Sequence, residues 1–109
     1  MICEQWDVVV VPFPFSERPA AKRRPALVLS RRIFNRAGHT VLAMITSGLH
    51  SPWPGDTALS DHRAAGLKVP CIVRLKLFTL DNRLLLKTIG RLSATDRGAV
   101  VASLETCLG

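Results

Sequence analysis

The chain has 109 residues, with 15 Lys and Arg against 8 Asp and Glu, a formal net charge of +7 and a sequence pI near 10.4. This length predicts a single domain, residues 1–109, and the 48% hydrophobic and 21% charged content excludes a disordered chain. The excess of positive charge favours an anionic partner, most often nucleic acid, an acidic protein or a membrane surface.

The cysteines and histidines exclude several kinds of site. Cys3, Cys71 and Cys107 are odd in number and far apart, so we expect free thiols in a reducing compartment rather than disulfides or a zinc site. The three histidines also lack paired ligand spacing, and we predict no metal and no other cofactor. No apolar run approaches the ~20 residues of a membrane span, and no signal peptide is visible. We therefore expect a cytoplasmic protein that does not bind membranes.

Three strands are predicted in the first half of the chain. Asp7–Val11 is short, and from Val8 onward it is β-branched, which is typical of a strand buried on both faces. Pro12 and Pro14 are expected to end it, because proline cannot donate to a strand ladder. After a polar loop over residues 16–24, a second strand is predicted over Pro25–Ser30 and a third over Thr40–Thr46.

The second half begins with a long loop, residues 47–67, which contains at most one short strand near Thr57–Leu59. Loops of this length are often functional. The next strand, Ile72–Leu80, has a period of two. That period predicts a core face with Val73, Leu75 and Leu77 and an opposite basic face with Arg74, Lys76 and Phe78. A turn at residues 81–83 is expected to join it in a hairpin to a further strand, Leu84–Arg91.

A C-terminal helix is predicted from its start signal and its apolar spacing. Ser93 followed by Asp96 has the form of a capping box. An apolar stripe at helical spacing follows: Val100, Val101, Leu104, Cys107 and Leu108. Five or six short strands and one terminal helix predict a mainly β protein, built as a small, strongly curved sheet or barrel.

The basic residues form two groups along the chain. Seven of them lie between residues 18 and 36, and six lie between residues 68 and 91. If the fold places the first group beside Arg74 and Lys76, a basic groove results, and the planar guanidinium of arginine suits phosphate oxygens. Solvated loop charges are the alternative that composition leaves open.

Several short segments, spread over nearly the whole chain, follow the order of one known family. They are Asp7–Phe15, Lys22–Ser30, Ile45–Ser47, Leu59–Asp61, Ala64–Lys68, Val73–Asp81 and Ile89–Ser93. Together they resemble the MazF/PemK family of type II toxin–antitoxin ribonucleases. The resemblance implies a β-barrel of the SH3-like MazF/PemK/CcdB type with a C-terminal α-helix, and a homodimer.

The resemblance also implies an activity and a catalytic pair. The activity is metal-independent, sequence-specific cleavage of single-stranded RNA such as mRNA, leaving 5′-hydroxyl and 2′,3′-cyclic phosphate ends. The family's catalytic arginine and threonine correspond to Arg24 and Thr46. Attack by the RNA 2′-hydroxyl gathers negative charge on phosphate oxygens, which a guanidinium and a hydroxyl donor stabilise. Glu17 and His39 are candidates for the general base.

Other residues are expected to hold the RNA. They are Lys22, Arg23, Ser47, Arg74, Lys76, Trp53 and Phe15. Basic side chains would contact phosphates, and aromatic rings, with Phe13 and Phe78 as further candidates, would stack on bases. The resemblance implies a cognate antitoxin, expected to be a disordered acidic segment with apolar anchors that folds over the same groove. DNA would be reached only through that antitoxin.

Two positions depart from the family pattern. Trp6 stands where a glycine commonly precedes the first strand, and His62 stands where an aromatic residue is common. We expect the first to alter the start of the strand and the second to alter the substrate loop, so the RNA preference of relatives does not transfer. The alternative function is binding without catalysis, as in gyrase-poisoning toxins of the CcdB type or a basic nucleic-acid-binding module. The presence of Arg24 and Thr46 argues against a gyrase poison.

Overall fold

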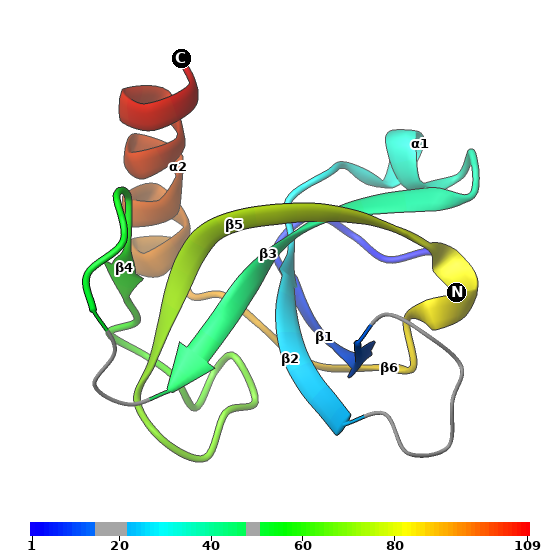
Figure 1. Cartoon of the computed structure of the whole chain (residues 1–109), viewed down its shortest axis with the longest axis horizontal. Coiled ribbons are helices and arrows are strands. Elements are labelled where there is room, and N and C mark those ends of the chain that lie inside the picture. The colour runs from blue at the N-terminus through cyan, green and yellow to red at the C-terminus, as the bar shows by residue number, and fades with distance from the viewer. Residues whose placement is uncertain (15–21, 48–50) are drawn as a thin grey trace.

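The computed structural model describes residues 1–14, 22–47 and 51–109, and this part of the chain holds six strands and two α-helices. The strands are β1 (Asp7–Phe13), β2 (Lys22–Val28), β3 (His39–Ser47), β4 (Thr57–Ala58), β5 (Cys71–Asp81) and β6 (Lys87–Arg91). The helices are α1 (Arg32–Asn35) and α2 (Ala94–Leu108), and a short 3-10 helix, η1, spans Asn82–Leu84. The strands form one curled sheet in the order β4-β5-β3-β2-β1-β6 (Figure 1). The predicted mainly β fold with a C-terminal helix is confirmed.

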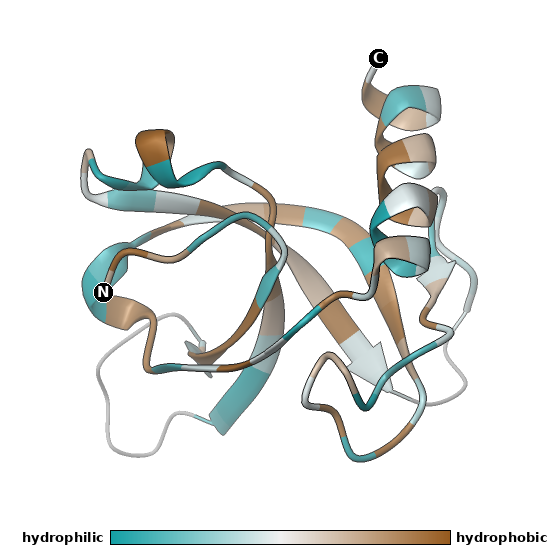
Figure 2. Ribbon diagram, turned by 180° about the vertical axis from the view of Figure 1, so that it is seen from behind, coloured by the Kyte–Doolittle hydropathy of each residue, from teal (hydrophilic) through white to brown (hydrophobic). Residues whose placement is uncertain are grey.

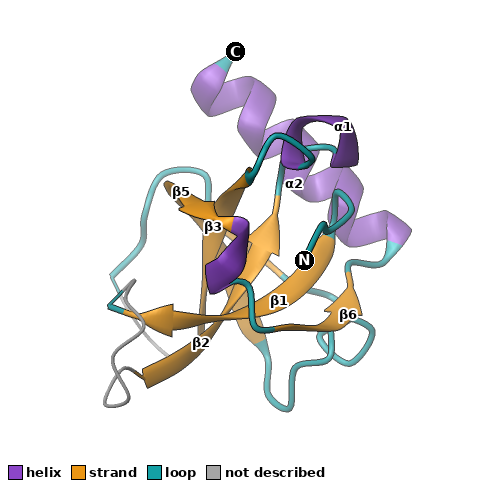
Figure 3. Cartoon of the chain, turned by 90° about the vertical axis from the view of Figure 1, so that its right-hand side faces the viewer, coloured by secondary structure: helices purple, strands orange, loops and turns teal. Residues whose placement is uncertain are grey.

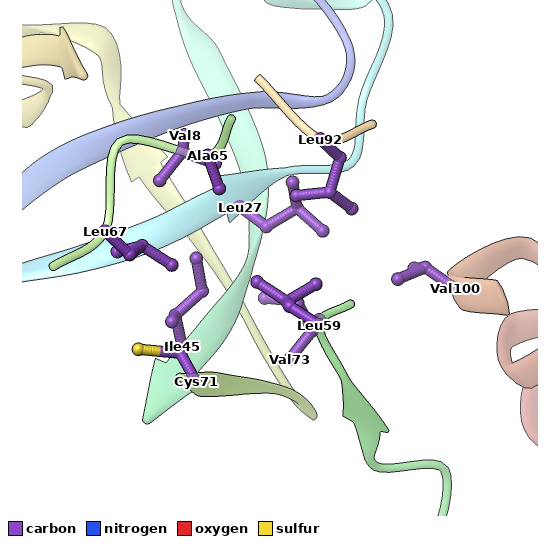
Figure 4. Close-up of a cluster of buried hydrophobic side chains, with 11 residues drawn as sticks. Val8, Leu27, Ile45, Leu59, Ala65, Leu67, Cys71, Val73, Leu92 and Val100 are labelled. Atoms are coloured by element: carbon purple, nitrogen blue, oxygen red, sulfur yellow. The ribbon is translucent and has the colours of Figure 1, made fainter. Parts of the chain in front are cut away.

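Apolar side chains are buried on both faces of the curled sheet. One core cluster contains Val8, Leu27, Ala43, Ile45, Leu59, Ala65, Leu67, Cys71, Val73, Leu92 and Val100 (Figure 4). The second contains Cys3, Val9, Val11, Ala26, Val28, Leu42, Leu80 and Leu85. Neighbours along β1 and β2 alternate between the two clusters, as strand geometry requires. The prediction that the first strand is buried on both faces is therefore confirmed.

Two prolines lie inside strands rather than at their ends. We expected Pro12 and Pro14 to end the first strand and Pro25 to begin the second. Instead, β1 continues through Pro12 to Phe13 and ends before Pro14, and β2 begins at Lys22. At Pro12, β1 pairs only with β2, because its pairing with β6 ends at Val10. At Pro25, β2 pairs only with β1. Each proline thus sits where its strand has one neighbour, the position in which a missing N–H is tolerated.

The predicted hairpin between the last two strands is wrong. β6 pairs with β1, at the opposite edge of the sheet from β5. The turn itself is present, because the Asp81 carboxylate accepts a hydrogen bond from the Arg83 N–H at 2.9 Å and caps η1. Asn82 then donates to the Asn35 carbonyl at 2.7 Å and accepts from the Thr40 hydroxyl at 2.8 Å. These contacts tie η1 to the end of α1 and to the start of β3, and the chain leaves β5 instead of folding back along it.

The predicted alternation along β5 holds only in part. Val73 is fully buried, but Leu77 is 40% exposed and the supposedly outward Arg74 is 8% exposed. The pairing with β3 shifts between Ala43, which faces Leu77, and Met44, which faces Arg74. Two residues of β5 are therefore extra at this point, and such an irregularity bends a strand and redirects its side chains. Phe78, expected on the basic face, packs against the second core cluster.

Helix α2 begins as predicted but uses its acidic residue differently. The Ser93 side chain accepts a hydrogen bond from the Asp96 N–H at 3.2 Å, which confirms it as the N-cap. The Asp96 carboxylate accepts from Ser60 N–H at 2.9 Å, Ser60 hydroxyl at 2.8 Å and Asp61 N–H at 3.0 Å. It thus anchors a distant loop. No helix in the described ranges is long and apolar enough to cross a membrane.

The Asp96 contacts predict a pH-dependent contribution to stability. Burial disfavours the charged form, but the hydrogen bonds from Ser60, Asp61 and Ser93 outweigh it and lower the pKa of Asp96. A lowered pKa in the folded state gives stability that is present above the unfolded-state pKa and is lost as pH falls through the folded value. Asp96→Asn is expected to reduce the free energy of unfolding by about 1.5–3 kcal/mol at neutral pH. Urea unfolding at several pH values measures this difference, which should shrink below about pH 4; a constant difference down to strong acid would contradict it.

Trp6 occupies a backbone conformation that explains why glycine is common at this position in the family. Its φ is +76°, a left-handed conformation that side chains other than glycine adopt rarely. Two hydrogen bonds hold it, from the Trp6 N–H to the Val28 carbonyl at 2.9 Å and from the Leu92 N–H to the Trp6 carbonyl at 3.1 Å. The indole packs against the first core cluster, which compensates for the strained backbone. β1 begins at Asp7, directly after Trp6.

Candidate functional site

The register between β2 and β3 brings the two predicted catalytic residues together. Ala26 of β2 pairs with Met44 of β3 in antiparallel orientation. Two residues before Ala26 is Arg24, and two residues after Met44 is Thr46. Both therefore lie just beyond the paired region, where the ends of the two strands separate (Figure 1). Figure 2 shows the start of β2 as the hydrophilic end of this strand.

A largely apolar cleft of about 270 Å³ opens at this point. It is lined by Val11, Phe13, Arg24, Pro25, Met44, Ile45, Thr46, Arg74 and Phe78. The Arg24 guanidinium lies over the ring of Phe13, 5.3 Å from its centre. Such a contact holds an exposed cation in place with a modest gain in free energy, so Arg24 is oriented without being neutralised.

A second cleft of about 230 Å³ shares Arg24 and Thr46 with the first. Its other lining residues are Pro25, Ile45, Ser47, Leu67, Lys68, Val69 and Cys71. No carboxylate or imidazole is among the described residues that line either cleft. Arg24 and Lys68 also form no ion pair with any residue in the described ranges. The walls of the second cleft therefore offer an anion two cations, Arg24 and Lys68, and two hydroxyl groups, those of Thr46 and Ser47.

Arg74, predicted to bind RNA, is instead committed to a carboxylate. Its Nε and Nη2 atoms donate to the two Asp56 oxygens at 3.1 and 2.9 Å, and Nη2 also donates to the Ser51 carbonyl at 3.0 Å. The hydrogen bonds from Arg74 lower the pKa of Asp56, and the same bonds raise the pKa of Arg74. Arg74 still lines the first cleft, but its charge is paired.

Lys76 and Trp53, also predicted to bind RNA, contact each other. The Lys76 ammonium lies 4.5 Å from the centre of the Trp53 ring. Trp53 remains 40% exposed. The Asp56 carboxylate accepts from the Trp53 N–H at 3.0 Å. Because Asp56 is held by Arg74, this ion pair fixes the Trp53 turn against β5.

This arrangement predicts how the Trp53 turn responds to pH. Because hydrogen bonds from Arg74 lower the Asp56 pKa, the clamp should persist as pH falls from 7 to about 4 and open below that. The ¹⁹F NMR signal of 5-fluorotryptophan at Trp53, assigned with Trp53→Phe, should stay constant over the upper range and shift in acid. Asp56→Asn should show the shifted signal already at pH 7. A Trp53 signal unaffected by Asp56→Asn would contradict the clamp.

The remaining predicted residues fall into four groups. Ser47 lines the second cleft, whereas Lys22 and Arg23 are exposed on β2 and line neither cleft. Phe15 and Glu17 lie outside the described residues. His39 as a general base is wrong, because it begins β3 and pairs with Asp81, seven residues or roughly 23 Å from Thr46 along the strand.

Sequence reasoning did not assign Lys68, Cys71 and Met44 to the site. Lys68 appeared only as one basic residue among many. The pairing of β3 with β5 could have placed Lys68 at the site. Cys71 at the start of β5 faces Ser47 at the end of β3, so the residues just before Cys71 must lie near the end of β3. In the described ranges, no group of three or more His, Cys, Asp or Glu side chains is arranged to hold a metal ion.

Comparison with known proteins decides the family. Residues 4–108 match the profile described as "PemK-like, MazF-like toxin of type II toxin-antitoxin system". The chain belongs to this family. No curated protein sequence matches it significantly.

Solved structures of MazF toxins have the same fold. The crystal structure of MazF from Deinococcus radiodurans is 26% identical, with a TM-score of 0.74, covering 100% of this chain and 98% of that one. A MazE–MazF structure from the same organism has 22% identity and a TM-score of 0.77, covering 100% and 98%. An endoribonuclease in complex with its cognate antitoxin from Mycobacterial species has 18% identity and a TM-score of 0.75, covering 98% and 95%.

Proposed function

We propose that this MazF-like chain is an endoribonuclease that cleaves single-stranded RNA, including mRNA, at a short sequence without a metal ion, and so inhibits growth. One observation carries the proposal: Arg24 and Thr46, brought together from two strands, line the same pair of clefts. Family membership supports the reaction class. The whole chain, residues 1–109, acts as one toxin domain in the cytoplasm.

The proposed reaction is transesterification followed by strand release. The RNA 2′-hydroxyl gives its proton to water as its oxygen forms a bond to the neighbouring phosphorus. The bond from phosphorus to the 5′-oxygen breaks and that oxygen takes a proton from water, so a 2′,3′-cyclic phosphate and a 5′-hydroxyl result. Negative charge on the non-bridging oxygens grows as the five-bonded state forms. The Arg24 guanidinium stabilises that charge through two N–H donors. The Thr46 hydroxyl donates a further hydrogen bond, and the absence of a carboxylate from the described cleft walls leaves this stabilisation unopposed.

We also propose that the chain is a homodimer neutralised by a cognate acidic antitoxin. It would associate with DNA only indirectly, through that antitoxin. Large apolar side chains are exposed on the two α-helices: Ile33 at 78% and Phe34 at 51% on α1, and Leu108 at 63% on α2. Both helices stand on the same side of the sheet (Figures 1 and 3). Exposed apolar surface of this kind favours association. Light scattering of the purified protein should give twice the chain mass of 11.9 kDa.

The decisive experiment is cleavage of single-stranded RNA by the purified protein in EDTA, with both new ends mapped. Discrete cuts that leave 5′-hydroxyl ends at one short sequence are expected. The absence of cleavage, together with inhibition of DNA gyrase in a topoisomer assay, would favour the non-catalytic alternative and overturn the proposal.

A further inference from the structure

The position of Arg24 and Thr46 between two clefts constrains how an RNA chain lies across the site. If the scissile phosphate rests on these two residues, the nucleotides on its two sides must leave in different directions. The first cleft presents Phe13 and Phe78, with Met44 between the paired strands. Such a surface suits a nucleobase, because aromatic rings stack on bases. The second cleft therefore receives the chain on the other side of the cleaved bond.

The second cleft carries the charge that a flanking phosphate requires. Lys68 lines it, and its ammonium group makes no hydrogen bond or ion pair with any described residue. The contrast with Arg74 is direct, since Arg74 lines the first cleft but is paired with Asp56. Among the cations that line the two clefts, only Arg24 and Lys68 are therefore available to phosphate in the described part of the chain.

The backbone that carries Lys68 is anchored before it reaches the cleft. The loop preceding Lys68 starts at Ser60 and Asp61, which donate three hydrogen bonds to Asp96. Further along, the Arg91 N–H of β6 donates to the Ala64 carbonyl at 3.0 Å. The loop is thus attached to both α2 and the edge of the sheet.

The residues on either side of Lys68 are also fixed. Leu67 is buried in the first core cluster, and its N–H donates to the His62 carbonyl at 2.9 Å. Cys71 begins β5 and pairs with Ser47, next to Thr46. The position of the Lys68 Cα atom relative to the catalytic pair is therefore set by the fold, which reduces the entropy lost when the side chain binds an anion.

We propose that Lys68 binds the RNA phosphate next to the scissile phosphate, on the side of the cleaved bond opposite to the base held by the apolar cleft. This inference rests on the proposed ribonuclease function. Lys68 is a substrate-binding residue in it: it positions the chain, and Arg24 and Thr46 act on the reacting phosphate. The position of the RNA along the site then depends on the loop that carries Lys68, which Asp96 and β6 hold in place.

The test measures binding of an RNA oligonucleotide that carries the mapped cleavage sequence and a 2′-deoxy sugar at the cleaved position. Wild type, Lys68→Gln and the control Lys87→Gln, an exposed lysine of β6 outside both clefts, are compared by fluorescence anisotropy. Lys68→Gln should weaken binding about tenfold at low salt, as expected for loss of one hydrogen-bonded charge pair. It should lower the salt slope of the affinity by about 0.7. Lys87→Gln should change neither.

A second arm identifies the phosphate. Methylphosphonate, which is uncharged, replaces each phosphate flanking the scissile one in turn. At one flanking phosphate, on one side of the scissile phosphate only, this replacement should weaken RNA binding by the wild type. The same replacement should leave RNA binding by Lys68→Gln unchanged. The assignment of Lys68 would be overturned if methylphosphonate weakened RNA binding equally in wild type and Lys68→Gln at every position, or if Lys68→Gln and Lys87→Gln bound RNA equally well. RNA cleavage by the wild type would still uphold the ribonuclease function in either case. Failure of the wild type to cut any RNA would overturn both.

Discussion

Arg24→Ala is expected to cleave RNA about 10²–10³-fold more slowly than the wild-type protein, the usual cost of removing one donor aimed at developing charge. The guanidinium is exposed, oriented over Phe13 and unpaired with any described carboxylate, so its removal leaves no buried partner unsatisfied. The fold should therefore survive the change, and the loss should appear in kcat. Single-turnover cleavage of an RNA with one mapped site measures it.

Two further variants separate charge from geometry and site from surface. Arg24→Lys keeps the positive charge but loses the planar pair of donors, and it should remain at least about tenfold slower than wild type. Arg23→Ala removes the neighbouring exposed arginine, which lines neither cleft, and it should retain the wild-type kcat. Equal cleavage by Arg24→Ala and wild type would refute the role of Arg24, and equal loss in Arg23→Ala would show that the effect is not specific to the cleft.

Local patterns predicted the elements that depend on local physics. β1 is a β-branched run, and burial on both faces needs nothing beyond that run and a curled sheet. The Ser93 cap and the start of α2 follow from side-chain hydrogen bonding within one turn. The apolar stripe of α2 is only partly buried, since Val100 is covered but Val101 is 38% exposed and Leu108 is 63% exposed. A stripe predicts an apolar face, and it does not say whether the chain itself covers that face.

Features that depend on distant partners could not be predicted in the same way. The Arg74–Asp56 pair joins residues 18 apart, and the pattern along β5 gave no sign that its central arginine would be neutralised. The pairing of β6 with β1 likewise depends on where η1 directs the chain. Arg24 and Thr46 were assigned from family resemblance, and the β2–β3 register explains why they meet. The same register, extended to β5, places Lys68 beside them.

Gly90→Ala is expected to be strongly destabilising, because a methyl group has no room where β6 meets the loop that carries Lys68. A Cβ atom on Gly90 would lie 2.6 Å from the Ala64 carbonyl oxygen and 2.5 Å from the Gly66 nitrogen, and it would also strike the carbonyl carbon of Ala65. All three are backbone atoms, so no side-chain rotation relieves the overlap. Either the loop or the edge strand must move, and Arg91 would lose its hydrogen bond to Ala64.

The expected loss is about 3 kcal/mol or more in the free energy of unfolding, at the upper end of the range for overpacked sites. The chain offers a matched control in Gly98 of α2, where a Cβ atom meets nothing within 4 Å. Gly98→Ala should stabilise the protein by roughly 0.5–1 kcal/mol, since alanine is the better helix former. Denaturant unfolding measures the free energy of unfolding of both variants, which should fall for Gly90→Ala and rise for Gly98→Ala. If Gly90→Ala proves as stable as the wild type, the loop does not pack on β6 as closely as the backbone positions require, and the anchoring of Lys68 would lose its main support.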